Sequence, residues 1–379
     1  MTATSTFDEA IPGASADAAQ RWFTVRRTLL VVLLIGMIVL SNLASYAFFR
    51  YLDVSVAGTE QTFAPNTWEF VVKVVFPPIG AIGLAAFVLL IEAWGMGWQQ
   101  SSLRRLLSPA NESTRNDLFY LLLYVSGLKP VLAFLFSLGT GYAIHRWVTA
   151  TFSVQLLEGV SFIPALAVVT LVNSLLFYWN HRLMHSRWLW EIHKVHHSAE
   201  EMNLITPHRN HPIDSAVTMV TYALPSAVLG ASEPVILTYT LLNGFYQSMA
   251  HSNLDWKLDR FGLGWVERWL LISSGGHRIH HSKSPEHWNR NFGITPLWDR
   301  LFGTWWPGPT DMKLEFGVDD SPIYNSGRPV RELWSVFRQA VLTARTEFRK
   351  LVGRRGSASR TLDSERAAKN DSISVGSGT

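Results

Sequence analysis

The 379-residue sequence has no cysteine and little charge. Without cysteine the chain has no disulfides, no thiolate zinc sites and no ordinary cysteine-ligated iron–sulfur clusters. Any metal must therefore be held by nitrogen and oxygen. Charged residues make up 16% of the chain, against about 25% in soluble domains, and the net charge is only +4. Lysine and arginine stand beside apolar segments rather than in one stripe, which argues against nucleic-acid binding.

Apolar residues, by contrast, account for 48% of the chain, and there are 16 tryptophans, a residue that gathers at membrane–water interfaces. Residues 28–49 form an uncharged run long enough to cross a hydrocarbon core of about 30 Å as a helix. Three further apolar runs, at residues 74–91, 118–144 and 160–179, bring the expected number of transmembrane helices to about four. Two shorter runs between residues 215 and 250 predict a kinked or shallow hairpin, because proline and glycine divide them.

Basic residues predict the orientation of these spans. Arginines lie in residues 21–27, before the first run, and at Arg104 and Arg105, after the second. The connection between the two runs, residues 50–69, carries three acids and one arginine. Cytoplasmic loops carry an excess of lysine and arginine, so both outer ends of this helical pair are expected in the cytoplasm.

The third apolar run is interrupted by Gly-Leu-Lys-Pro at residues 127–130. A lysine at the middle of a bilayer is costly. We therefore expect a short interfacial helix, a break, and then a span that ends near His145. The fourth span would return the chain to the cytoplasmic side just before His181.

Three motifs concentrate histidine at that boundary: HRLMH (residues 181–185), HKVHH (193–197) and HRIHH (277–281). In a helix, positions i, i+3 and i+4 share one face, so the imidazoles of each motif can converge. One four-coordinate zinc ion would leave about half of the eight unused. Two metal ions about 3.5–4 Å apart would explain the near-duplicate motifs. Imidazole suits Zn, Fe, Cu and Ni alike, so ligand type does not choose the metal.

A single such motif could instead be interfacial, or could contact anionic lipid headgroups. Three motifs assigned to one membrane face favour a metal site. The HExxH pattern of many zinc proteases is absent.

The three motifs resemble the histidine boxes of the sterol desaturase / fatty acid hydroxylase family, whose members are integral-membrane di-iron oxygenases. The resemblance continues in HHSAEEMN (196–203), NHPID (210–214), AHSNLD (250–255) and NFGITPLWDRLFGT (291–304). It covers the chain from about Leu171 to Thr304.

The resemblance implies nine metal ligands, namely the eight box histidines and His251: His181, His185, His193, His196, His197, His251, His277, His280 and His281. Five further residues are expected either as ligands or as groups that orient a ligand: His211, Asp255, Asp299, Glu200 and Asn203. Asp255 stands where fatty acid hydroxylases have a second histidine, which points toward the sterol-oxidase and ether-lipid branches. For Asp299 a structural salt bridge with Arg300 is an equal alternative. The remaining histidines, His145, His208 and His287, are expected at the interface or surface.

The expected fold is an all-α integral membrane protein with about four transmembrane helices, a kinked or shallow hairpin, and a cytoplasmic histidine-rich cap that holds a dimetal site. The expected segments are a disordered leader (1–20), an N-terminal transmembrane region (21–155), a fatty acid hydroxylase-like catalytic domain (156–310), a C-terminal extension (311–350) and a disordered tail (351–379).

The resemblance also implies the chemistry: two non-haem Fe ions, O2 as co-substrate, and a bilayer lipid whose C–H bond is hydroxylated or desaturated, with ether cleavage left open. No flavin, haem or ferredoxin module is visible in the sequence, so an external electron donor is expected, either cytochrome b5 or a ferredoxin with its reductase. The active site would face the cytoplasm, in a bacterial inner membrane or the endoplasmic reticulum.

Two other functions remain open at this stage. A non-catalytic membrane metal-binding or transport protein would carry polar or histidine residues inside its spans, whereas here the spans are nearly free of them. A binuclear zinc hydrolase would need neither iron nor O2.

Overall fold

The computed structural model describes residues 76–107, 111–152, 155–254, 262–310, 313–319 and 323–375. These ranges contain helices and no strand. The one β-type contact within them is an isolated bridge between Ser282 and Phe316. The all-α expectation is therefore confirmed for the described part of the chain. The expected leader, the first expected span and Asp255 lie outside it.

The described helices are α3 (Phe76–Met96), α4 (Ser102–Leu107), α5 (Glu112–Val125), α6 (Leu128–Phe136), α7 (Thr140–Phe152), α8 (Phe162–Met184), α9 (Trp190–His197), α10 (Pro212–Leu229), α11 (Glu233–His251), α12 (Gly264–Trp269), α13 (Ser274–His281), α14 (Pro296–Leu301) and α15 (Pro329–Val375). Short 3-10 turns lie at η2 (Trp98–Gln100), η3 (Thr206–His208) and η5 (Pro285–His287).

Two compact units divide the chain. One comprises Met1–Ile82 and Leu122–Val131, and the other comprises Gly83–Leu121 and Leu132–Thr379. Residues on both sides of position 155, where the sequence suggested a boundary, belong to the second unit. That unit contains every residue discussed below as part of the site.

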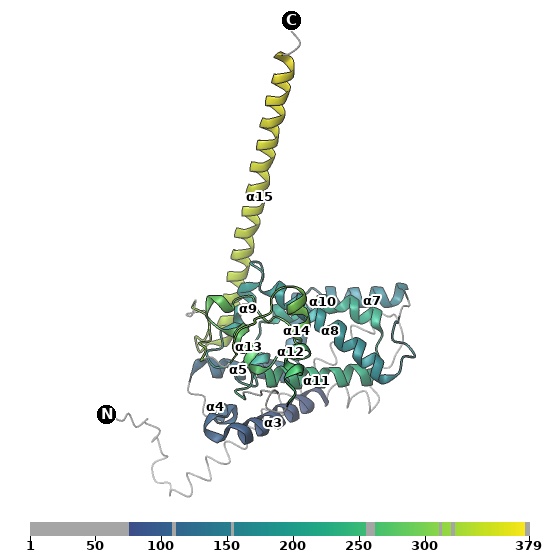
Figure 1. The fold of residues 1–379 in the computed structure, drawn as a ribbon, viewed down its shortest axis with the longest axis vertical. Helices are drawn as coiled ribbons and strands as arrows, with labels where there is room; N and C mark the ends of the chain where they lie inside the picture. The colour runs from purple at the N-terminus through teal and green to yellow at the C-terminus, as the bar shows by residue number, and fades with distance from the viewer. Residues whose placement is uncertain are drawn as a thin grey trace, which may run out of the picture. The chain divides into compact units, whose positions relative to one another are not determined.

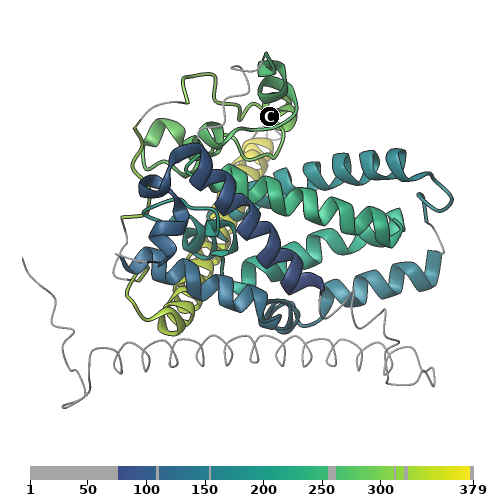
Figure 2. The ribbon, with the colours of Figure 1, turned by 90° about the horizontal axis from the view of Figure 1, so that it is seen from below.

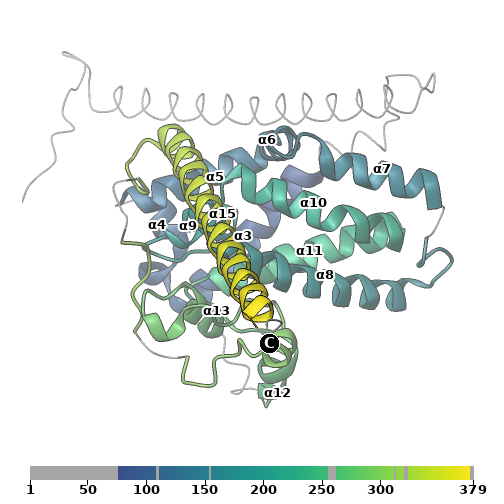
Figure 3. The same cartoon turned by 90° about the horizontal axis from the view of Figure 1, so that it is seen from above.

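Within the second unit, helices α7, α8, α10 and α11 lie together and extend to one side, with α9, α12, α13 and α14 at the other end (Figure 1 and Figure 3). In Figure 2 the same helices, coloured teal to green, extend to the right of the view. Helix α10 packs on α7 and α8, and α11 packs on α8 and α13. Buried Val169 of α8 and Val235 of α11 belong to one apolar cluster, which holds the outer end of this group together.

Helix α8 is the one described helix that is, by itself, long and apolar enough to cross a membrane. It has 23 residues, and only 22% of its most apolar window is buried within the protein. Ile163 and Leu171, for example, are 70% and 52% exposed. Pro164 lies in its first turn, where a missing N–H costs nothing. Apolar side chains that no protein surface covers fit a lipid environment.

The third expected span differs from the prediction. The chain breaks between α5 and α6 at the expected place, with an 84° bend. It then breaks again after Phe136, so no continuous helix runs to His145. The second break is a helix-ending Schellman turn, in which the N–H of Gly139 donates to the carbonyl of Phe134 and Leu138 has a φ of 51°. The described residues contain one helix that meets the length and hydropathy of a span by itself, or two if the bent pair α5 and α6 counts as one span, and the expected number of about four stays a prediction.

The expected hairpin is a pair of helices, α10 and α11, joined by a short turn at residues 230–232. Gly230 has a φ of 56°, and a Cβ there would lie 2.7 Å from Cβ of Gln155. The turn thus needs glycine both for its backbone conformation and for its close contact.

The tail also differs from the prediction. Residues 351–375 continue helix α15, whereas their low apolar content predicts disorder. No proline interrupts this segment, and no glycine lies between Gly356 and Val375, so nothing in its local sequence ends the helix.

Close packing of α7 on α10 leads to a prediction about stability. Gly141 of α7 lies against Met219 of α10, and a Cβ there would come within 2.9 Å of the Met219 carbonyl oxygen. Replacing Gly141 by leucine should lower the free energy of unfolding by about 1–3 kcal/mol, because overpacking forces the two helices apart. Thermal unfolding in detergent measures the change. The matched control is Ala143→Leu, on the exposed face of the same helix, and an equal loss in both variants would contradict the prediction.

Candidate metal centre

Four helices bring all nine expected histidine ligands together. His181 and His185 lie at the C-terminal end of α8, and His251 is the last residue of α11. The HKVHH box forms the end of α9 and the HRIHH box the end of α13. Helix α13 begins at Ser273, whose hydroxyl accepts the N–H of Gly276, an ordinary N-cap.

The nine imidazoles form two groups, and in each group the candidate ligand nitrogens lie within 4.8 Å of one another. The first group is His181, His185, His193, His197 and His280, and the second is His196, His251, His277 and His281. Each HxxHH box is thus divided: its i and i+4 histidines enter one group and its i+3 histidine the other. Helix α9 gives two members to the first group, and α13 gives two to the second. Neither group is built from one box.

Main-chain and carboxylate oxygens fix the tautomers of five of these rings. Nδ1 lies within hydrogen-bond distance of an acceptor in each: His181 with the Phe292 carbonyl (2.8 Å), His193 with Asp214 (2.9 Å), His196 with the Arg209 carbonyl (3.2 Å), His251 with the Gln247 carbonyl (2.8 Å) and His280 with the Arg290 carbonyl (2.8 Å). Since a carbonyl can only accept, Nδ1 of the ring it faces must donate. In a neutral ring Nε2 then carries a lone pair, the arrangement usual in metal-bound histidine.

Several Nε2 atoms of the nine rings have no hydrogen-bond donor to face. Nε2 of His181, His193, His280 and His281 is buried without a partner in the described part of the chain. Nε2 of His196 lies 3.3 Å from Nε2 of His251. Because both rings already donate through Nδ1, no hydrogen is left to join those two atoms. Converging lone pairs that cannot satisfy one another are costly when buried, and a cation removes that cost. The residues therefore fit a bound metal.

Burial favours the neutral form of three rings of the HRIHH box, His277, His280 and His281. The pKa of His280 is lowered to about 3, chiefly by desolvation and further by the nearby His193 and His251. Desolvation, followed by neighbouring imidazoles, likewise lowers the pKa of His277 and His281 well below the usual value. At neutral pH these three imidazoles are thus in the deprotonated form that a metal requires.

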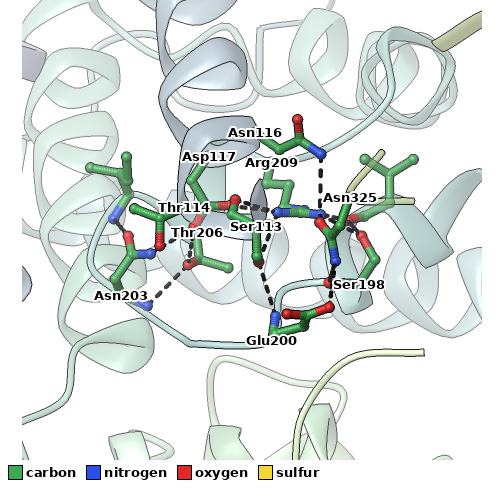
Figure 4. Close-up of polar contacts among 12 residues, drawn as sticks. Ser113, Thr114, Asn116, Asp117, Ser198, Glu200, Asn203, Thr206, Arg209 and Asn325 are labelled. Atoms are coloured by element: carbon green, nitrogen blue, oxygen red, sulfur yellow. Dashed lines mark hydrogen bonds and ion pairs between the residues drawn. The ribbon is translucent and has the colours of Figure 1, made fainter. Parts of the chain in front are cut away.

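A buried arginine, Arg209, lies at the centre of a network of polar side chains (Figure 4). The Arg209 guanidinium donates to the carbonyls of Val195 (2.9 Å) and Ser113 (2.8 Å), and it pairs with Asp117 (3.1 Å). Its remaining N–H groups reach Ser198 (2.7 Å) and the Asn325 side chain. Arg209 therefore ties α5 to the end of α9.

Arg209 acts on His196 in two ways. Its own carbonyl accepts from the His196 ring, and its side chain holds the carbonyl of Val195, the residue before His196. Asp117 has a side chain with no exposed surface and balances the buried charge, which would otherwise be expensive.

Glu200 and Asn203 lie in this network rather than against an imidazole. Asn203 donates to Asp117 (2.6 Å), and Glu200 accepts from Asn325 (3.2 Å). Both are visible around Arg209 in Figure 4.

His211 lies outside both histidine groups. Its Nε2 donates to the Leu333 carbonyl (3.1 Å) and its Nδ1 accepts from the N–H of Ile213 (3.2 Å). With both nitrogens in use, His211 has no lone pair left for a metal. It fixes the start of α10, which carries Asp214.

Asp299 organises the loop that follows the third box. It accepts from the N–H groups of Phe292 and Gly293 (2.8 Å each) and from the Thr304 hydroxyl (2.7 Å). Burial raises its pKa, although these hydrogen bonds oppose the rise. Because the Phe292 carbonyl holds the His181 ring, Asp299 orients a ligand through one intervening residue. The alternative of a salt bridge with Arg300 is not what is seen: Arg300 lies over the rings of Trp269 and Trp305.

The expectation that His287 is a surface residue is wrong. It is 1% exposed and packs edge-on against Trp306. The prediction failed because a histidine with no box partner carries no signal of burial.

Sequence reasoning missed Asp117, Arg209 and Asp214 as functional candidates. Asp214 ends the NHPID motif, and its contact with His193 could have been suspected from the motif alone. Asp117 and Arg209 are 92 positions apart, and no local pattern pairs them.

Two cavities reach the histidines. One, of about 370 Å3, is lined by members of both groups together with Trp190, Lys194, Lys283 and Trp288. The other, of about 220 Å3, lies among α8, α10 and α11.

Comparison with known proteins places residues 166–304 in the fatty acid hydroxylase family model. The chain is 32% identical over 164 residues to alkylglycerol monooxygenase of Danio rerio, which covers 42% of this chain and 33% of that protein. It is 31% identical over 143 residues to ornithine lipid hydroxylase OlsE of Rhizobium tropici (37% and 41%). It is 28% identical over 133 residues to lathosterol oxidase of Rattus norvegicus (35% and 42%). The aligned part thus spans less than half of each relative. No solved structure matches the chain.

Replacing Arg209 by lysine should weaken the second histidine group. A lysine ammonium cannot make the several directed hydrogen bonds of a guanidinium, so the Val195 carbonyl and Ser198 lose their donor. We expect metal affinity to fall roughly ten- to hundredfold, as is usual when a group that orients a ligand is changed. Metal titration of the purified protein measures the effect. The control is Arg187→Lys, on an arginine whose side chain is 53% exposed, and equal affinities in all three proteins would contradict the role of Arg209.

Buried His211 predicts a loss of stability in acid. Burial lowers its pKa to about 4 from the ordinary 6.5, so between these values the unfolded chain binds a proton that the folded protein does not. The contribution of His211 to stability is complete above pH 6.5 and is lost as the pH falls toward 4. It amounts to about 3 kcal/mol at most.

Unfolding temperatures of wild type and His211→Gln across this range measure that contribution. The variant should show a shallower decline, while His145→Gln, at an exposed position, should follow the wild type. Parallel curves for wild type and His211→Gln would refute the prediction.

Proposed function

Because the chain belongs to the sterol desaturase / fatty acid hydroxylase family through residues 166–304, we propose that it is a membrane-bound di-iron oxygenase that hydroxylates or desaturates a lipid C–H bond with O2. The observation that carries this proposal is the convergence of nine imidazoles, eight of them buried, in two groups whose candidate ligand nitrogens lie within 4.8 Å of one another. Five would hold one ion and four the other. The bound irons would supply the activation of O2.

The protein itself supplies geometry and a dry site. Carbonyls and Asp214 hold five of the nine rings in one tautomer, so these ligands are in place before a metal arrives. Eight of the nine histidines are 1–8% exposed. Such burial excludes water from the reaction, which prevents side reactions of a reactive centre.

Lipid as the substrate class has two supports. The histidines at the end of α8 directly follow the described helix best suited to a bilayer. The names of the relatives also describe oxidation of lipids: an alkylglycerol, an ornithine lipid and lathosterol. Hydroxylation, desaturation and ether cleavage share the removal of a hydrogen atom as a first step, so this ligand set serves any of them.

Cellular context follows from the same proposal. Basic residues near the expected membrane ends support a location of the histidines at the cytoplasmic face, in a bacterial inner membrane or the endoplasmic reticulum. Electrons would come from a separate donor, cytochrome b5 or a ferredoxin with its reductase.

Metal and oxygen dependence test the proposal. The purified protein should contain about two irons per chain and should consume O2 only with a reductant and a lipid substrate. Chelation should abolish this activity, and iron should restore it. His196→Ala, from the second group, and His280→Ala, from the first, should each bind less iron and lose at least about a hundredfold in lipid oxidation, because each removes one ligand of an ion.

His145→Ala is the control, since His145 is exposed on α7 and belongs to neither group. Full activity in either ligand variant would remove the metal role. Zinc in place of iron, with hydrolysis that needs neither O2 nor reductant, would instead favour the hydrolase.

A further inference from the structure

The two cavities divide the nine histidines between them. The 220 Å3 cavity touches His181, His193, His196, His251 and His277, and the 370 Å3 cavity touches His185, His197, His280 and His281. No histidine is shared, so the candidate centre is reached from two different sides.

The smaller cavity is the one that lipid can approach. Its walls are Phe177, Asn180 and Met184 of α8, Thr218 and Tyr222 of α10, and Gln247 of α11. Helices α8 and α11 also expose large apolar side chains, among them Leu171 (52%) and Leu242 (56%). A molecule leaving the bilayer between these helices would arrive beside histidines of both groups.

Charge in this cavity is limited to one side chain besides histidine, Asp214, which is already hydrogen-bonded to His193. The cavity therefore has no cation to pair with a phosphate or carboxylate. The larger cavity, by comparison, contains Lys194, Lys283 and Asp319. A charged group placed in the smaller cavity would lose its hydration without a counter-charge.

Neutral hydrogen-bonding groups, however, are abundant there. The side-chain amide of Gln247 makes no hydrogen bond with any described residue. Gln247 lies one turn before His251, and its carbonyl holds the His251 ring, so the amide and a candidate ligand share one face of α11. Asn210, also in the wall, donates through Nδ2 to the Pro207 carbonyl (3.3 Å), which leaves its buried Oδ1 as an unpaired acceptor.

Size adds a constraint. A water in the liquid occupies about 30 Å3, so a 220 Å3 cavity holds on the order of seven groups of that size. The oxidised carbon and any group that meets the amides must share this space. A plain alkyl chain in the cavity would offer the amides no hydrogen-bond partner. A site that hydrogen-bonds its substrate rejects an analogue that lacks the hydrogen-bonding group.

We infer that the substrate is a lipid with a neutral hydrogen-bonding group, a hydroxyl or a carboxamide, within a few bonds of the carbon that is oxidised, and that Gln247 binds this group. The inference rests on the proposed function. It makes Gln247 a determinant of specificity, since the side chain contacts the substrate and not the metals.

A set of chain-matched probes tests the inference: a long-chain primary alcohol, the corresponding primary amide, the carboxylate and the alkane. With the iron-loaded full chain, product formation should favour the alcohol or amide over the alkane and the carboxylate by about ten- to hundredfold in kcat/KM. Gln247→Leu should lose that preference while it retains bound iron. Thr240→Val, an exposed polar-to-apolar change on the same helix, should retain the preference.

Binding without iron supplies an independent readout. The alcohol should raise the unfolding temperature of the metal-free wild type, and it should not do so in Gln247→Leu. Equal wild-type use of alcohol and alkane, a preference for the carboxylate, or unchanged discrimination and binding in Gln247→Leu would each overturn the inference. Absence of iron, or of O2 uptake with every probe, would instead contradict the proposed oxygenase.

Discussion

The structure depends on one electrostatic condition: buried imidazoles turn their Nε2 atoms toward one another, and four of these atoms have no hydrogen-bond partner among the described residues. Oxygen acceptors cause this by holding Nδ1 of five rings, and desolvation maintains it by disfavouring the protonated form. Water cannot relieve the repulsion, because several of the Nε2 atoms are inaccessible. One cation in each histidine group would satisfy the lone pairs of that group, so metal binding and the final packing of these helices should be coupled.

The division of the HxxHH boxes makes that coupling non-local. On a helix, i and i+4 lie about 40° apart around the axis, whereas i+3 lies about 60° to the other side. One box can therefore face two ions. Because α9 and α13 each contribute to both groups, a shift of either helix disturbs both ions. This explains why α9 is held in place by several contacts. The Arg209 side chain donates to the Val195 carbonyl of α9, and Asp214 accepts from the His193 ring.

The sequence predicted the site better than the fold. Helical spacing was enough to indicate that the boxes converge, since i, i+3 and i+4 are fixed by helix geometry. It did not indicate how each box is divided, because that depends on where α13 lies relative to α9. The second break, at Leu138 and Gly139, was not predicted because the residues around it are apolar, and hydropathy does not detect a helix end within an apolar run. This helix end depends on two backbone hydrogen bonds, from the N–H groups of Leu138 and Gly139. The pairing of Asp117 with Arg209 is a tertiary contact that no local pattern predicts. Hydropathy assigned the residues directly after Asp117 to a transmembrane run, so Asp117 was not considered as part of a polar network.

Buried polar groups differ in their hydrogen bonding between the two sides of the candidate metal centre, the Arg209 network and the small cavity. In the network, Arg209 has all its N–H directions engaged by α5, α9 and the Asn325 segment, so that region is fully satisfied and rigid. On the side of the small cavity, Oδ1 of Asn210 is buried without a partner, and the Gln247 amide lines the wall without a hydrogen bond to any described residue. A protein that satisfies its polar groups where it needs rigidity has no stability reason to leave the Asn210 oxygen unpaired. Its cost in the unliganded protein is recovered only when a ligand supplies the missing partner, which is how a site discriminates between otherwise similar lipids.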